Sequence, residues 1–140
     1  MENIEKLVVT LFNDPFPHMI CNDFYNPEEL ELVWEELNFY TKPGKLLEAK
    51  DYGGVVGYTN AKALMLDSVY RDFSGSDGVN YRNLSNILTV NRKLFTSGVL
   101  DAFAGVHDCC CIANQSNTDT TKIRYYHDGE GYDPHTDKGF

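Results

Sequence analysis

The chain has 140 residues, the length of one ordinary domain, and 42% of them are apolar, which is enough to build a packed core. The formal net charge is −9, so we expect no general phosphate-binding surface and no nucleic-acid partner. The sequence contains no run of about 18 apolar residues, so we expect no membrane-spanning segment.

Four cysteines are present, Cys21 and the run Cys109-Cys110-Cys111. Adjacent cysteines do not form the usual disulfide geometry, and no C-x-x-C spacing suggests zinc. The first residues also lack the basic and apolar regions of a signal peptide. We therefore expect reduced thiols in a cytoplasmic protein.

Two short strands are the first elements that the sequence predicts. Leu7–Leu11 and Phe16–Ile20 are apolar runs, and residues 13–15 between them form a strong turn sequence. Because Pro15 and Pro17 cannot donate to a β-ladder, we expect an edge strand or an extended arm.

The clearest predicted helix begins after Asn26, a favoured N-cap. Pro27 suits the first helical turn, and Glu29 stands where its side chain can reach the amide of the cap residue. An apolar stripe at helical spacing then predicts a side that faces the core. The stripe consists of Leu30, Val33, Trp34 and Leu37. A ligand-stacking role for Trp34 stays open.

The middle of the chain holds one ambiguous segment and one predicted helix. Residues 60–67 fit a strand or the start of a helix, because periodicity does not decide over so few residues. From Leu84 to Phe103 apolar residues recur at helical spacing, so we expect one supporting helix, weakened at Gly98.

Three strands are predicted near the C-terminal end. Residues 107–113 form the first, and residues 121–126 pair back onto it after a polar turn. Residues 132–137 follow a second turn at 127–131. Because the connections are short, we expect antiparallel pairing.

The third of these strands contains the pair His135 and Asp137, separated by one residue. Residues i and i+2 of a strand point to the same face, so an imidazole and a carboxylate can converge on one metal ion. A neutral imidazole nitrogen, a carboxylate oxygen and open positions suit iron(II). We take His135 and Asp137 as candidate metal ligands, with surface loop residues as the alternative.

The residues before this pair extend the motif in a fixed order: Tyr126, the Gly129-Glu130-Gly131 turn, Tyr132 and Pro134. The string from Tyr125 to Asp137 resembles the iron(II)- and 2-oxoglutarate-dependent dioxygenases, most closely the prolyl 4-hydroxylase-like branch. An apolar strand, then Asp-Phe-Tyr and Pro-Glu-Glu-Leu at residues 23–30, also resembles the opening of many members.

The resemblance implies an oxidoreductase that hydroxylates a small-molecule or peptide substrate, with peptidyl proline as one candidate, and releases succinate and CO₂. The cofactors would be iron(II), 2-oxoglutarate and O₂, with ascorbate left open. Tyr126 stands nine residues before His135, as does the family's oxoglutarate-binding tyrosine, and takes that role by resemblance. A packed strand tyrosine is the alternative, Tyr125 is the neighbour with which it could be confused, and His127 is a lesser candidate ligand.

The family takes a second His and a basic residue, Arg or Lys, from strands downstream of the H-x-D pair, and this sequence ends three residues after Asp137. We expect one truncated domain, 1–140, in which residues 1–106 are a supporting region and residues 107–140 the first core strands. The expected fold class is α+β, the N-terminal portion of a double-stranded β-helix (jelly roll) whose later strands are missing. The alternative function is a non-catalytic binding module or an inactive fragment on the same scaffold.

Overall fold

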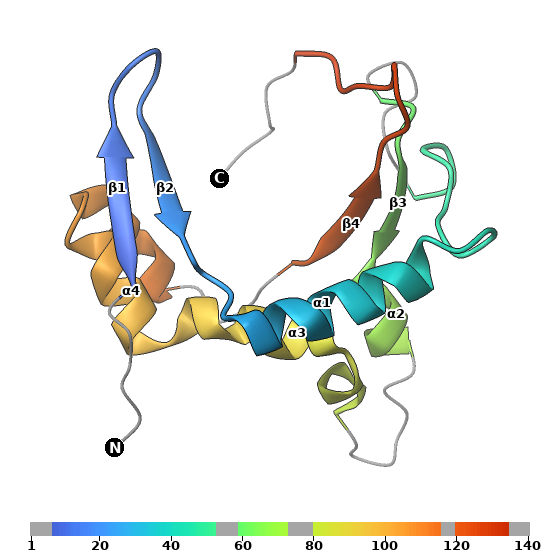
Figure 1. Ribbon diagram of the computed structural model, residues 1–140, viewed down its shortest axis with the longest axis horizontal. Helices are drawn as coiled ribbons and strands as arrows, with labels where there is room; N and C mark the ends of the chain where they lie inside the picture. Colours follow the sequence, from blue (N-terminus) through green and yellow to red (C-terminus); the bar gives the residue numbers. More distant parts are fainter. Residues whose placement is uncertain (1–6, 53–58, 73–79, 116–119, 135–140) are drawn as a thin grey trace. The chain divides into compact units, whose positions relative to one another are not determined.

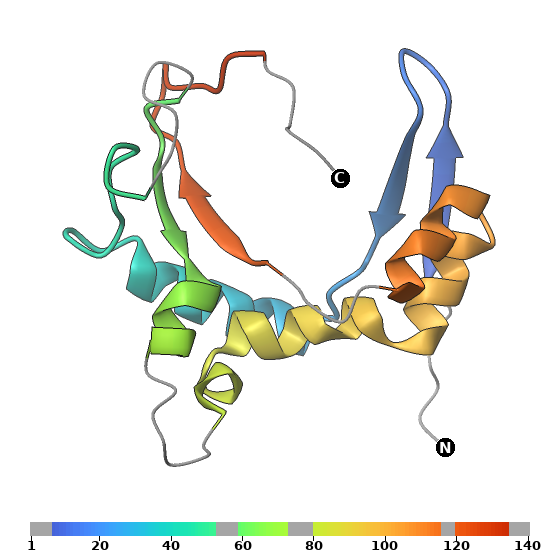
Figure 2. The same cartoon turned by 180° about the vertical axis from the view of Figure 1, so that it is seen from behind.

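The computed structural model describes residues 7–52, 59–72, 80–115 and 120–134 (Figures 1 and 2). Within these ranges the fold is mixed α+β, with four α-helices and two antiparallel sheets of two strands each, which confirms the predicted class at this level. None of the helices in the described ranges is both long and apolar enough to cross a bilayer. The chain forms two compact units: unit 1 is Met1–Val33 with Asn86–Asp119, and unit 2 is Trp34–Ser85 with Thr120–Phe140.

Unit 1 begins with a β-hairpin, as the two apolar runs predict. Strands β1 (Val8–Phe12) and β2 (His18–Asn22) pair antiparallel, with Thr10 opposite Ile20. Alternate residues face opposite sides, so one side of the hairpin is half-buried and the other is exposed. Both strands are edge strands of this sheet, which fits the prolines between them.

Residues 107–113 do not form the predicted strand; they begin the 3-10 helix η3 (Asp108–Gln115). The prediction is wrong because a short apolar run does not distinguish a strand from a helical segment, and Ile112 is the single β-branched residue of this run. The amide of Cys110 donates to the carbonyl of His107 over 3.0 Å and starts the helical turn. η3 then packs against α4 (Ser97–Ala104).

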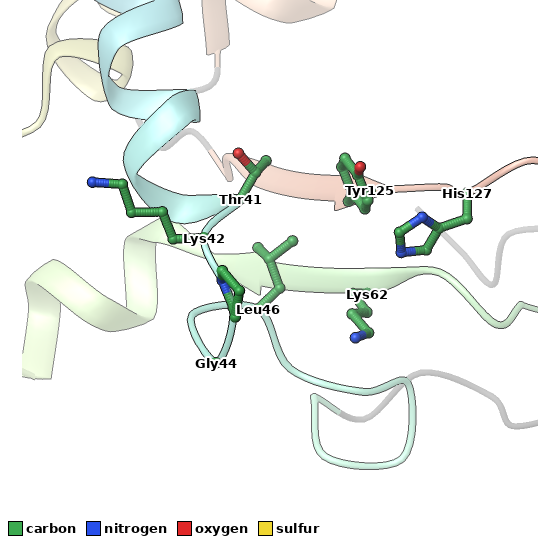
Figure 3. Close-up of a pocket in the computed structure, with 8 residues that line it drawn as sticks. Thr41, Lys42, Gly44, Leu46, Lys62, Tyr125 and His127 are labelled. Atoms are coloured by element: carbon green, nitrogen blue, oxygen red, sulfur yellow. The ribbon is translucent and has the colours of Figure 1, made fainter.

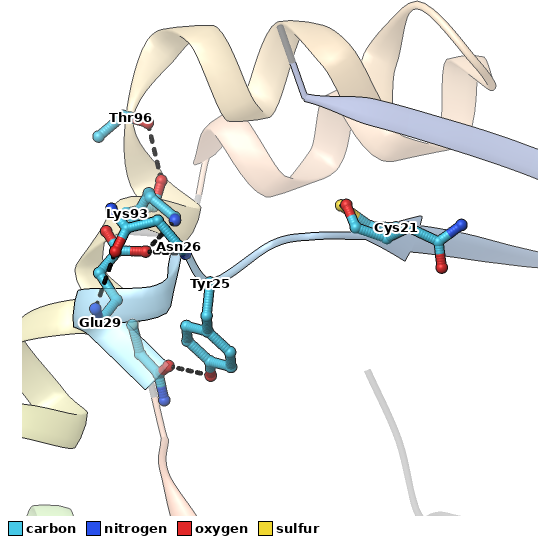
Figure 4. Close-up of polar contacts among 8 residues, drawn as sticks. Cys21, Tyr25, Asn26, Glu29, Lys93 and Thr96 are labelled. Atoms are coloured by element: carbon cyan, nitrogen blue, oxygen red, sulfur yellow. Dashed lines mark hydrogen bonds and ion pairs between the residues drawn. The ribbon is translucent and has the colours of Figure 1, made fainter. Parts of the chain in front are cut away.

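The helix predicted over residues 84–103 is broken into α3 (Asn86–Asn91), the 3-10 helix η2 (Arg92–Phe95) and α4. The break lies at Thr96, whose ψ of 145° is extended, while Gly98 lies inside α4. The hydroxyl of Thr96 donates to the carbonyl of Lys93 over 2.7 Å (Figure 4). A threonine that bonds the preceding turn, and not the glycine, therefore interrupts the helix.

Helix α1 (Pro27–Tyr40) starts with the predicted capping box (Figure 4). The amide of Glu29 donates to Asn26 Oδ1 over 2.8 Å, and the amide of Asn26 donates to Glu29 Oε2 over 3.0 Å. Lys93 also forms an ion pair with the Glu29 carboxylate. Partial burial raises the pKa of Glu29, but the hydrogen bonds from Lys93 and from the Asn26 amide lower it overall.

The buried side of α1 differs from the predicted stripe. Val33 is 8% exposed and Leu37 is half-buried, but Leu30 and Trp34 are 42% and 57% exposed. The prediction of Trp34 as a core residue is wrong, because the inward side of the helix is rotated toward two polar positions, Glu36 and Tyr40.

Glu36 and Tyr40 are buried in unit 2 because their polar atoms have partners. Ser85 donates to Glu36 Oε1 over 2.7 Å, and the hydroxyls of Tyr40 and Tyr70 are hydrogen-bonded at 2.7 Å. Burial, together with the Tyr70 hydroxyl, raises the pKa of Tyr40 well above its usual range, so this hydroxyl stays protonated. The hydrogen bonds fix which side of α1 faces inward.

The sheet of unit 2 joins segments that are far apart in the sequence. The ambiguous residues 60–67 contain both predicted structures, strand β3 (Lys62–Met65) and the start of α2 (Leu66–Asp72). Strand β4 (Lys122–Tyr125) is confirmed, but it pairs antiparallel with β3 and not with residues 107–113. That partner is wrong in the prediction because sequence-adjacent pairing is a tendency that tertiary packing can override.

A buried carboxylate, that of Asp67, binds the backbone immediately before β4. Asp67 is 3% exposed, pairs with Arg82 of η1 (Tyr81–Leu84) and accepts a hydrogen bond from the amide of Thr121. The amide of Leu66 donates to the carbonyl of Thr121 over 3.0 Å. Two consecutive residues at the β3–α2 junction thus fix the residue immediately before β4.

Replacing Asn26 with Ala should lower the free energy of unfolding by about 1 kcal/mol, because the N-cap bond to the amide of Glu29 is lost. The matched control is Asn38→Ala, at an exposed position inside the same helix, which should not destabilise the protein. Urea denaturation of both variants measures the difference, and equal stability of the two would contradict the capping role.

Replacing Asp67 with Asn should cost about 3–5 kcal/mol, because it removes the negative charge from a buried ion pair. The control is Glu48→Gln. Glu48 pairs with Lys62 at 3.4 Å with both side chains about half exposed, so its loss should cost at most about 1 kcal/mol. Chemical denaturation compares the two variants. Similar losses in the free energy of unfolding would show that the Asp67 pair stabilises the protein no more than an exposed ion pair does.

Candidate functional site

Strand β4 and the residue after it place the candidate side chains on two faces of the sheet. Successive residues of a strand point to opposite sides, so Ile123 and Tyr125 share one face, and Arg124 and Tyr126 share the other. Ile123 is 7% exposed and belongs to the core of unit 2, whereas Tyr126 is 40% exposed. Tyr126 and Tyr125, the two tyrosines considered for one role, therefore face different surroundings.

Arg124, Tyr126 and Tyr132 form a cluster on one face. The guanidinium carbon of Arg124 lies 4.6 Å from the centre of the Tyr132 ring, and Nη1 donates to the Tyr126 hydroxyl over a long 3.5 Å. The hydrogen bond to Tyr126 is the largest cause of the raised pKa of Arg124. Sequence reasoning did not single out Arg124, although its position two residues before Tyr126 in a predicted strand is a usable signal.

The predicted glycine turn follows this cluster. The amide of Glu130 donates to the carbonyl of His127 over 3.0 Å, and Glu130 Oε2 accepts from the amide of His127 over 2.8 Å. Gly129 has a φ of +82°, a left-handed conformation that suits glycine. Tyr132 then forms an antiparallel bridge to Thr59. After the turn, the chain therefore pairs with the segment that precedes β3, the strand with which β4 pairs.

The two candidate metal ligands, His135 and Asp137, lie outside the described residues. Among the residues that are described, no three His, Cys, Asp or Glu side chains are grouped so that they could hold a metal ion. The His127 ring packs edge-on against Tyr125, with the ring centres 4.8 Å apart. The donor atoms of His135 and Asp137, one imidazole nitrogen and one carboxylate oxygen, fit iron(II) chemically as part of a larger ligand set.

A cavity of about 250 Å³ lies in unit 2 (Figure 3). It is lined by Thr41, Lys42, Pro43, Gly44, Leu46, Lys62, Tyr125 and His127. Lys62 pairs with Glu48 at 3.4 Å, and the Lys42 ammonium lies 5.8 Å from the Phe39 ring, pointing away from Tyr125 and His127. Both ammonium groups therefore have other partners, and the cavity does not offer a preformed site for an anion.

No family model, no curated protein and no solved structure matches this chain.

The turn provides a test of local geometry. Replacing Gly129 with Ala should cost about 1–2 kcal/mol, because an L-residue is strained at a φ of +82°. The matched control is Gly131→Ala, two residues away and without a positive φ, where an added Cβ also meets nothing within 4 Å. Thermal or chemical unfolding should separate the two variants; equal stability would mean that the left-handed turn does not contribute.

Proposed function

We propose that this chain is part of an iron(II)- and 2-oxoglutarate-dependent dioxygenase that hydroxylates a substrate and releases succinate and CO₂. The observation that carries the proposal is the ordered string from Tyr126 through the glycine turn to His135 and Asp137. The jelly-roll architecture belongs to the same proposal, with β3 and β4 as two of its strands. Substrate class follows from the resemblance alone, and a small molecule or a peptidyl side chain such as proline are the candidates.

The residues of this chain would have two binding roles, one toward the metal ion and one toward 2-oxoglutarate. His135 and Asp137 would hold iron(II), which supplies the oxidative chemistry when it is bound with 2-oxoglutarate and O₂. Tyr126 would bind a carboxylate of 2-oxoglutarate. Because Arg124 donates to the oxygen of the Tyr126 hydroxyl, the hydroxyl hydrogen stays free to donate to that carboxylate. The opposite orientation of Tyr125, toward the cavity, favours Tyr126 over Tyr125 for this role.

The proposal needs two groups from outside these 140 residues. A second His would complete the metal ligands, and a basic residue would pair with the far carboxylate of 2-oxoglutarate. A charge-assisted bond of that kind is roughly twice as strong as a neutral one, so the Tyr126 hydroxyl alone does not replace it. By the resemblance, both groups would come from strands downstream of the H-x-D pair.

We expect the protein extended by its downstream reading frame to bind one iron(II) and to form succinate in an iron-dependent manner. His135→Ala and Asp137→Ala should each abolish turnover and lower iron affinity sharply, because each removes a ligand. The matched control is His127→Ala, in the same segment, which should leave iron affinity unchanged. Iron titration and a succinate assay with and without iron(II) measure both properties.

Three outcomes contradict parts of this proposal in different ways. Unchanged iron affinity in both His135→Ala and Asp137→Ala would reject the metal site. Loss of iron binding in His127→Ala would indicate that His127, in the turn, is a metal ligand. Iron binding without turnover, with or without candidate substrates, would favour a non-catalytic binding module on the same scaffold. The 140-residue chain alone should form negligible succinate.

A further inference from the structure

Sulfur-containing side chains meet inside unit 1, on the half-buried side of the hairpin. Met19 and Cys21 are two residues apart on β2 and therefore face the same side. The thiol of Cys110, on η3, lies 3.7 Å from the thioether sulfur of Met19. Hairpin, α4 and η3 lie side by side in this unit (Figures 1 and 2). The contact joins two residues separated by 91 positions in the sequence.

The geometry of this contact suits a shared metal ion. Two sulfur atoms 3.7 Å apart can both reach one ion at about 2.3 Å, a usual metal–sulfur bond length, with an angle of roughly 110° between the bonds. The Cys21 thiol is engaged differently, since it donates to the carbonyl of Asn22 over 3.8 Å. Met19 and Cys110 are therefore the pair that the fold brings together.

The donor types select the metal. Zinc takes cysteine sulfur, histidine nitrogen and carboxylate oxygen, but a thioether and thiolates together suit Cu(I). Because the described residues contain no group of three His, Cys, Asp or Glu suited to a metal, a site here depends on the methionine. We propose that Met19 and Cys110, with Cys109 as the third ligand, form a site for one Cu(I) ion.

The third ligand and the access route both come from η3. Cys109 is the residue before Cys110 on η3, and after burial its hydrogen bond is the next cause of the raised pKa of the Cys110 thiol. Cys109 is exposed and Cys110 is half-buried, so an ion can arrive from solvent at Cys109 and pass to the inner sulfurs. Each cysteine ligand would lose its proton on binding, and no oxidation or reduction of the protein is required.

The test is a titration of the full 140-residue chain with Cu(I) under oxygen-free, reducing conditions, against a coloured Cu(I) chelator. Losing an outer-shell partner costs about 10- to 100-fold in metal affinity, so loss of a ligand in Met19→Leu or Cys110→Ser should cost at least about 100-fold. Met19→Leu keeps the volume of the side chain and should leave the fold intact, which circular dichroism checks. The matched control is Cys111→Ser, the next residue of η3, which should bind Cu(I) like the unchanged chain.

Zn(II) is the second probe. We expect Met19→Leu to lower Cu(I) affinity and to leave any weak Zn(II) binding unchanged, because zinc does not use the thioether. Unchanged Cu(I) affinity in a folded Met19→Leu variant would overturn the proposal. Equal losses in Cys110→Ser and Cys111→Ser would overturn it as well, since they would indicate a site made by the exposed thiols alone. These readouts involve neither His135 nor Asp137, so they are independent of the proposed iron chemistry.

Discussion

Unit 2 depends on the carboxylate of Asp67. Its two oxygens connect the β3–α2 junction with Arg82 of η1 and with the amide of Thr121, which immediately precedes β4. A buried charge is stable only where partners replace water, so the three segments must meet in one arrangement. Because β4 carries Arg124, and Tyr126 follows it, the orientation of the candidate site depends on Asp67, a residue that is remote from the site in sequence.

A single strand then separates two kinds of surface. One face carries the Arg124 cluster with its aromatic rings, and the other carries the cavity beside Tyr125. Alternation along β4 accounts for this separation, so two neighbouring tyrosines have different surroundings without any difference in side-chain chemistry. The charge of Arg124 beside a phenol hydroxyl suits an anionic ligand, whereas the lysines around the cavity are engaged by Glu48 and by an aromatic ring.

The two proposed metal sites follow opposite donor chemistry. By donor chemistry, the imidazole and carboxylate of the H-x-D pair would suit iron(II), and the sulfurs of Met19 and Cys110 would suit Cu(I). The residues of the first pair are separated by one residue, so the two-residue period of a strand suffices to suggest the pair. The second pair is assembled by the packing of η3 beside the hairpin, and neither residue carries a local signal of the other. Arg124 lies between these cases, since its spacing from Tyr126 is visible but its contacts are tertiary.

The sequence by itself determined the features whose partners lie within a few residues. The capping box at Asn26, the hairpin strands and the turn at residues 127–131 follow from local hydrogen bonds and backbone sterics, and the structure has all three. Tertiary structure decided the partner of β4, the helical state of residues 107–113 and the exposure of Trp34. In each of these cases the apolar pattern allowed more than one arrangement, and the choice was made by contacts with segments far away in the chain.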